Sequence, residues 1–241
     1  MTTSSTDRRH ESRPTQHAAD AEPSEGSAGL SPSTLLRQAG AGLRLLLVIT
    51  VLFGVIYPLG VWAVARIPGL ASHAEGSLIE GPAGPTGSSL IGIDPVPANP
   101  GADPWFHTRP SASAPNSSPA GLGPADPTTS GGSNLAADST TLADAVTQRR
   151  GVIAGREGVS PELVPPDAVT ASGSGLDPQI SPAYAALQAP RVARVTGLSL
   201  TQVQQLIVAN TQGRGLGFAG EPGVNVPAID AALRAASPSA R

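Results

Sequence analysis

A serine-rich turn comes closest to a catalytic motif in this chain of 241 residues. Residues 171–175, Ala-Ser-Gly-Ser-Gly, approach the Gly-x-Ser-x-Gly elbow that exposes the serine nucleophile of hydrolases. Ser172 stands where that motif needs its first glycine, and no histidine follows Ser174 to act as its base. The sequence therefore indicates a glycine-rich turn and argues against a hydrolase triad in the usual chain order.

The histidines and the missing cysteines limit the chemistry further. None of His10, His17, His73 and His107 forms a His-x-x-x-His pair or lies near a carboxylate at metal-ligand spacing. The chain has no cysteine, which removes disulfides and thiolate ligands. We therefore predict no catalytic residue, no metal site and no covalently bound cofactor.

Lysine is also absent, since all 15 basic residues are arginine. A Walker phosphate loop, a protein kinase and Schiff-base catalysis each need a lysine. The Asp-Lys-Thr-Gly phosphorylation sequence of P-type ATPases is missing as well. The chain is therefore not itself a conventional ATP hydrolase, and its net charge of −3 gives no electrostatic case for nucleic acid as a partner.

Three polar loops stand out among the turns. They are residues 105–112, Trp-Phe-His-Thr-Arg-Pro-Ser-Ala; residues 130–135, Ser-Gly-Gly-Ser-Asn-Leu; and residues 170–178, which contain Ser172 and Ser174. Such turns present backbone N–H groups and hydroxyls, which either bind an anion or lock the fold. The residues alone favour the structural role.

Polar side chains on a following helix are the remaining candidates for a contact site. Gln188, Arg191 and Arg194 are placed to meet a phosphate or a partner's carboxylate. Exposed arginines on a helix more often form a solvated face, so both interpretations stay open.

The clearest structural element in the sequence is an uncharged, apolar run between Arg44 and Arg66. As a helix it spans roughly 30 Å, the thickness of the hydrocarbon core of a bilayer. We therefore predict a transmembrane helix over residues 43–66. The alternative is a signal peptide cleaved after Ala65, because residues 63–65, Ala-Val-Ala, have the small-x-small form of a cleavage site.

The arginines near this helix predict its orientation. Arg37 and Arg44 precede it, whereas Arg66 follows it and the next arginine is Arg109. The bias places the N-terminus in the cytoplasm and the C-terminal domain outside, in a single-pass protein of the cell membrane. Residues 1–36 are polar and are expected to form a disordered cytoplasmic tail.

Residues 67–241 are expected to form an α+β domain. We predict short strands at residues 88–93 and 224–226. Helical periodicity covers residues 140–156 and 227–236, and Pro182 opens another helix, which Pro190 should kink or restart. Ser199 and Gln202 form a capping-box pattern ahead of a further helix, which ends before Gly213.

Six segments in a fixed order behind one N-terminal helix resemble the KdpC family, the C subunits of the Kdp potassium-transporting P-type ATPase. The resemblance covers residues 43–236. The segments that carry it are Ser89-Leu90-Ile91-Gly92, Phe106-x-x-Arg109-Pro110-Ser111-Ala112, residues 130–135, residues 171–177, Gln188-x-x-Arg191-Val192-Ala193 and Val224-Asn225-Val226.

The resemblance implies an accessory subunit of a high-affinity, ATP-driven potassium import complex, needed for its assembly and stabilisation. Its partners would be a channel-like potassium-translocating subunit, a P-type ATPase subunit and a small single-helix subunit, within the membrane lipid. The family has also been described as a catalytic chaperone that raises the ATP affinity of the ATPase subunit. Nucleotide or partner contacts would then involve Gln188, Arg191, Arg194, Ser172, Ser174 and Asn134.

An external domain conflicts with direct ATP binding, because ATP is scarce outside the cell. We therefore weight a structural or potassium-entry role above direct ATP binding, with potassium as the transported ion and Asp94, Asp103 and Asp177 as candidate oxygen donors near the entry. The chain departs from the family pattern at Pro227 and Asp230, where Leu and Asn are usual. The rival hypothesis is a stand-alone binding module of the cell envelope, either membrane-anchored or secreted.

Overall fold

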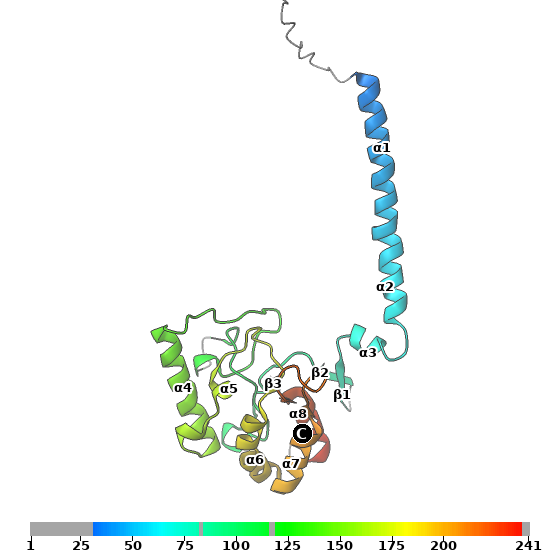
Figure 1. Cartoon of the computed structure of the whole chain (residues 1–241). Coiled ribbons are helices and arrows are strands. Elements are labelled where there is room, and N and C mark those ends of the chain that lie inside the picture. The colour runs from blue at the N-terminus through cyan, green and yellow to red at the C-terminus, as the bar shows by residue number, and fades with distance from the viewer. Residues whose placement is uncertain (1–30, 82–83, 116–118, 238–241) are drawn as a thin grey trace, which may run out of the picture. The chain divides into compact units, whose positions relative to one another are not determined.

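Two compact units make up the chain, a helical unit that ends at Val61 and a folded domain from Trp62 onward. The computed structural model describes residues 31–81, 84–115 and 119–237 (Figure 1). The predicted disorder of the N-terminal tail falls on residues 1–30, which lie outside the described residues. Residues 32–36, which were assigned to that tail, are helical.

A single long helix precedes the domain. It consists of α1 (Pro32–Val51), a π-helical turn η1 (Leu52–Ile56) and α2 (Tyr57–Ala65). The 34 residues from Pro32 to Ala65 form the one helix, among the described residues, that is long and apolar enough to cross a membrane. The helix starts earlier than the predicted residue 43, because Pro32 suits the first helical position.

Proline explains the wide turn in the middle of this helix. Pro58 has no amide hydrogen, so the carbonyl one turn before it cannot receive its usual backbone hydrogen bond. The π-helical turn Leu52–Ile56 ends two residues before this proline. Single π-turns inside an α-helix are rare, and they mark places where the regular hydrogen-bond ladder is interrupted.

The domain mixes helices and short strands, as the α+β prediction requires. Its α-helices are α3 (Ala71–Ala74), α4 (Thr140–Glu157), α5 (Pro166–Val169), α6 (Pro182–Thr196), α7 (Leu200–Ala209) and α8 (Val226–Ala236). Its 3₁₀ turns are η2 (Pro100–Ala102), η3 (Pro119–Gly121) and η4 (Pro161–Leu163). Its strands are β1 (Leu78–Gly81), β2 (Gly84–Ser88), β3 (Gln179–Ile180), β4 (Thr211–Gln212) and β5 (Gly223–Asn225).

The strands form two small antiparallel sheets. β1 pairs with β2, while β5 lies between β3 and β4. The predicted strand at residues 224–226 is confirmed as β5, although Val226 already begins α8. The strand predicted at residues 88–93 is wrong: β2 ends at Ser88, and Gly92 instead donates its N–H to the carbonyl of Leu176.

Polar caps set where the predicted helices begin. Ser181 and Asn225 cap α6 and α8 with their side-chain oxygens, and the capping box of Ser199 and Gln202 opens α7 as predicted. We predicted a kink or a restart at Pro190; the restart is wrong, because α6 continues through that residue.

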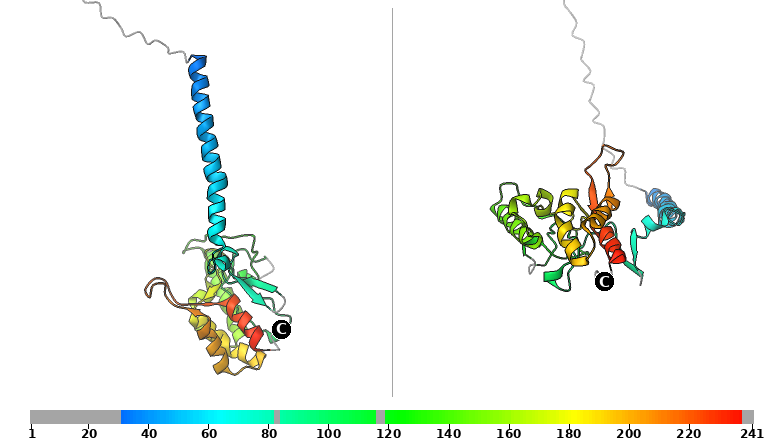
Figure 2. Two further views of the ribbon diagram at one scale, coloured as in Figure 1. Left: turned by 90° about the vertical axis from the view of Figure 1, so that its right-hand side faces the viewer. Right: turned by 90° about the horizontal axis from the view of Figure 1, so that it is seen from below.

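The core lies where α6 packs against α4 and α7, and where α7 packs against α8 (Figures 1 and 2). Aromatics are scarce, yet Tyr184 of α6 and Phe106 of a long loop are its largest fully buried side chains. Ile153, Val192 and Leu233 fill the space around them. The loop that carries Phe106 is therefore part of the core, which also fixes the polar residues on either side of it.

Candidate functional site

A buried polar network lies at the centre of the domain, where the loop that contains residues 94–108 packs against α4 and α6. Gln188 and Arg191 of α6 are both buried, with 0% and 3% of their surfaces exposed. The amide oxygen of Gln188 accepts the N–H of His107 at 2.8 Å and a guanidinium N–H of Arg191 at 3.1 Å. Two residues of the predicted contact site therefore hold the loop to the helix.

Arg191 connects three parts of the chain. Its Nε donates to the Oε2 of Glu157 on α4 at 2.9 Å, and its Nη1 donates to the backbone carbonyl of Asp103 at 2.7 Å. Arg156 contacts the other carboxylate oxygen of Glu157 and donates to the hydroxyl of Tyr184. Because these groups are buried, each hydrogen bond here replaces one that water would otherwise make.

His107 lies between two carboxylates. Its Nδ1 contacts Asp94 at 3.0 Å, and its Nε2 contacts Asp103. Burial alone would lower the pKa of His107, but the attraction of Asp94 and the hydrogen bonds outweigh it, so the pKa lies above its ordinary value. Burial would raise the pKa of each aspartate, yet contacts with His107 leave both pKa values below the ordinary range.

The network pairs carboxylates with basic side chains. Asp94, Asp103 and Glu157 are in contact with His107, Arg156 and Arg191. Paired charges of this kind are stable in a protein interior only while every partner is present. The arrangement can lock the loop in place, and it leaves the Arg191 guanidinium fully engaged, so that Arg191 is not available to an incoming phosphate.

Two sequence-based expectations need correction at this network. Arg191 does not lie on a solvated face of its helix, although Arg194, one turn further on, is exposed. His107 was expected to lie far from any ligand-spaced carboxylate, yet two carboxylates contact its ring. The spacing of Asp103 and His107, four residues apart in a proline-rich loop, was the signal available in the sequence. No group of three His, Cys, Asp or Glu side chains in the described part of the chain could hold a metal ion.

The other candidate residues lie where two glycine-rich loops meet. Gly131 donates its N–H to the carbonyl of Ser174 at 2.7 Å, and the hydroxyl of Ser130 contacts the same carbonyl. Gly175 has a φ of +73°, and a Cβ there would lie 2.9 Å from the Gly131 carbonyl. The close fit of these loops explains their glycines without a ligand.

Arg109 holds the second of these loops, residues 170–178, in place. Its Nη1 lies 3.0 Å from Asp177, and its other nitrogens donate to the carbonyls of Thr170 and Ala171. Ser172 is buried, whereas Ser174 is exposed. Asn134 is exposed as well and has a left-handed φ of +52°. The six predicted contact residues thus do not form one site: three are interior or exposed parts of α6, and three belong to the paired loops.

The carboxylates proposed as potassium donors are already engaged. Asp94 and Asp103 contact His107, and Asp177 contacts Arg109 and the N–H of Gln179. Potassium would have to compete with these cations and donors for the same oxygens. The geometry therefore favours a structural role for all three.

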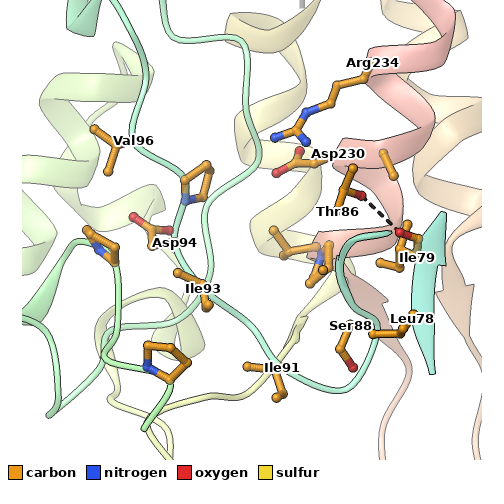
Figure 3. Close-up of a pocket in the computed structure, with 17 residues that line it drawn as sticks. Leu78, Ile79, Thr86, Ser88, Ile91, Ile93, Asp94, Val96, Asp230 and Arg234 are labelled. Atoms are coloured by element: carbon orange, nitrogen blue, oxygen red, sulfur yellow. Dashed lines mark hydrogen bonds between the residues drawn. The ribbon is translucent and has the colours of Figure 1, made fainter. Parts of the chain in front are cut away.

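A cavity of about 610 Å³ opens between the β1–β2 hairpin, α8 and the segment around Ile93 (Figure 3). Asp230 lines it and is buried, and its Oδ1 accepts the N–H of Phe106 at 2.9 Å. Burial raises the pKa of Asp230 to about 8. The Arg234 guanidinium lies over the Trp105 ring, 4.6 Å from its centroid. Asp230 of α8 therefore anchors the same loop as Gln188 of α6, through the neighbouring backbone N–H group.

Fold and site together define a membrane-associated α+β protein with one N-terminal helix. Residues 39–235 match the family described as KdpC, the c chain of the K⁺-transporting ATPase. A relative from Kineococcus radiotolerans, named potassium-transporting ATPase KdpC subunit, is 48% identical over 87% of this chain and 99% of its own length. Relatives of the same name from Beijerinckia indica and Mycobacterium tuberculosis are 43% and 42% identical, over 81% and 82% of this chain and 92% and 97% of their own.

The chain belongs to the KdpC family, as the six segments predicted. It is an accessory subunit of the multi-subunit Kdp potassium-transporting ATPase, and it is associated with the membrane. The match spans the helix and the domain, so the stand-alone envelope module is not favoured.

Proposed function

We propose that this chain is a non-catalytic assembly subunit that stabilises the potassium import complex. The observation that carries the proposal is the burial of Gln188 and Arg191 in an internal network. A nucleotide phosphate would have to displace Glu157 and Asp103 to reach Arg191, which would leave buried charges unpaired. The family motif around these two residues is accounted for by the folding of the domain.

The proposed partners are the channel-like potassium-translocating subunit, the P-type ATPase subunit and the small single-helix subunit. One helix cannot enclose a pathway for an ion, so potassium transport needs other membrane-spanning chains. The helix Pro32–Ala65 offers a surface to such chains, because its apolar segment is not buried within this chain. We expect ATP to bind only to the assembled complex and not to this chain by itself.

An effect on the ATP affinity of the ATPase subunit would act through contact with a partner. The exposed candidates for such a contact are Arg194, Ser174 and Asn134. Ser172, Gln188 and Arg191 would support it only indirectly, by holding the loops and α6 in place.

We further propose that the N-terminus is cytoplasmic and that residues 67–241 lie outside the membrane. The arginines at the two ends of the apolar run support this orientation. An external domain is also consistent with a structural role, because the nucleotide is on the other side.

The orientation can be tested with single cysteines, because the chain has none of its own. We expect Ser133→Cys, at an exposed position of the domain, to react with a membrane-impermeant maleimide in intact cells. The control Ser5→Cys should react only after the membrane is permeabilised. The reverse labelling pattern would contradict the proposal and would make the domain accessible to ATP.

A further inference from the structure

A loop between β4 and β5 displays two large apolar side chains. Residues 213–221 project from the domain in both views of Figure 2. Leu216 and Phe218 are 91% and 75% exposed, although the chain contains only three phenylalanines in all. Exposed apolar residues that stand together mark interaction sites more often than single ones do.

The loop is a defined hairpin. Gly215 and Ala219 exchange two backbone hydrogen bonds of 2.8 Å, and Arg214 forms an ion pair with Glu221 beside them. Leu216 has a left-handed φ of +53°, which a β-carbon disfavours and which glycine or asparagine would adopt more easily. The sequence thus keeps a bulky residue in a strained, solvent-exposed position, where it makes no contribution to the core.

The size of the patch limits what it binds. Two such side chains supply on the order of 300 Å², whereas a stable interface between free proteins buries roughly 1,200–2,000 Å². The patch is therefore too small to hold a second copy of this chain by itself. It suffices for a partner that is already held nearby, because a membrane anchor in the same complex raises the effective concentration of the two surfaces.

The charge of the loop argues against the bilayer as that partner. Arg214 and Glu221 neutralise each other, so the hairpin offers no surplus cation to anionic headgroups. An aromatic residue with an aliphatic neighbour is instead the type of anchor that fills a pocket at a protein interface.

We propose that the 213–221 loop is a docking loop that inserts Leu216 and Phe218 into an apolar pocket on another subunit of the same potassium-transporting complex. This inference rests on the proposed assembly function and assigns part of that function to one surface. The loop would fix the position of the domain, while the helix holds the chain in the membrane.

A photoreactive benzoylphenylalanine in place of Phe218, in the full-length chain within the cell membrane, tests the contact directly. We expect a cross-link to another subunit of the complex, identified by mass, and none from the same probe at Val208, which is 75% exposed on α7. Cross-links only to lipid or to a second copy of this chain would overturn the proposal.

A double variant, Leu216→Ser with Phe218→Ser, measures the strength of the contact. We expect recovery of partner subunits on the tagged chain, after a stringent detergent wash, to fall roughly tenfold. The thermal midpoint should not fall, because neither side chain is buried, and Val208→Ser should change neither quantity. If the double variant recovered as much partner as the wild type does, the docking loop would be refuted but the assembly function would stand. If the wild-type chain itself recovered no partner subunit, the assembly function would be refuted.

Discussion

Replacing Arg191 by methionine is expected to destabilise the domain by about 3–5 kcal/mol, the range measured when one partner of a buried ion pair is removed. Glu157 would lose the donor to its Oε2, and the backbone carbonyl of Asp103 would lose the donor at 2.7 Å. Methionine fills a similar volume, so the loss would come from unpaired polar groups rather than from an empty cavity. Thermal unfolding of the full chain in detergent, followed by circular dichroism, would show a midpoint lower by roughly 10 °C.

Arg194→Met is the matched control for this experiment. Arg194 lies on the same helix and carries the same charge, but it is exposed. Its replacement should change the unfolding free energy by less than about 0.5 kcal/mol. If Arg191→Met kept the stability of the wild type, but the complex needed a higher ATP concentration to reach half of its maximal activity, Arg191 would be a nucleotide contact. The structural interpretation would then be wrong.

Asp230→Asn is expected to stabilise the domain at neutral pH by on the order of 4 kcal/mol and to change little near pH 4. Burial raises the pKa of Asp230 to about 8 in the folded state, against an ordinary value of 3.8. The folded state therefore holds a proton that the unfolded state releases, and stability is lost as the pH rises from about 4 to about 8. Each unit of pKa difference corresponds to about 1.4 kcal/mol.

Asparagine should keep the useful part of this side chain, because its amide oxygen can still accept the N–H of Phe106. Denaturant titrations of both full-length proteins at pH 4 and pH 7.5 measure the difference. An equal difference at the two pH values, or a less stable variant at pH 7.5, would show that Asp230 is not protonated in the folded state.

Local signals in the sequence predicted much of the fold. The serine caps, the capping box and the helical spacing gave the starts of α6, α7 and α8, because these features act over one helical turn. The apolar run gave the membrane helix for a similar reason. The two-residue strands β3 and β4 escaped prediction, because they are too short to show an alternating pattern, and β3 pairs with β5 across a long stretch of the chain.

The candidate site was predicted only in part, because burial is a tertiary property. Arg191 and Arg194 look alike in sequence, and only the packing of α4 and of the 94–108 loop onto α6 separates the interior one from the exposed one. The departure of Asp230 from the family pattern was visible, but its contact with Phe106 spans 124 positions in sequence. Family motifs therefore identified important residues more reliably than they identified what those residues do.

Removing this chain from cells is the most direct test of its role as an assembly subunit. The P-type ATPase subunit would carry the affinity tag, and co-purified chains would be identified by mass after extraction in mild detergent. We expect the channel-like subunit to co-purify only when this chain is present, and high-affinity potassium uptake to be lost without it. Intact assembly and intact uptake in its absence would contradict the account.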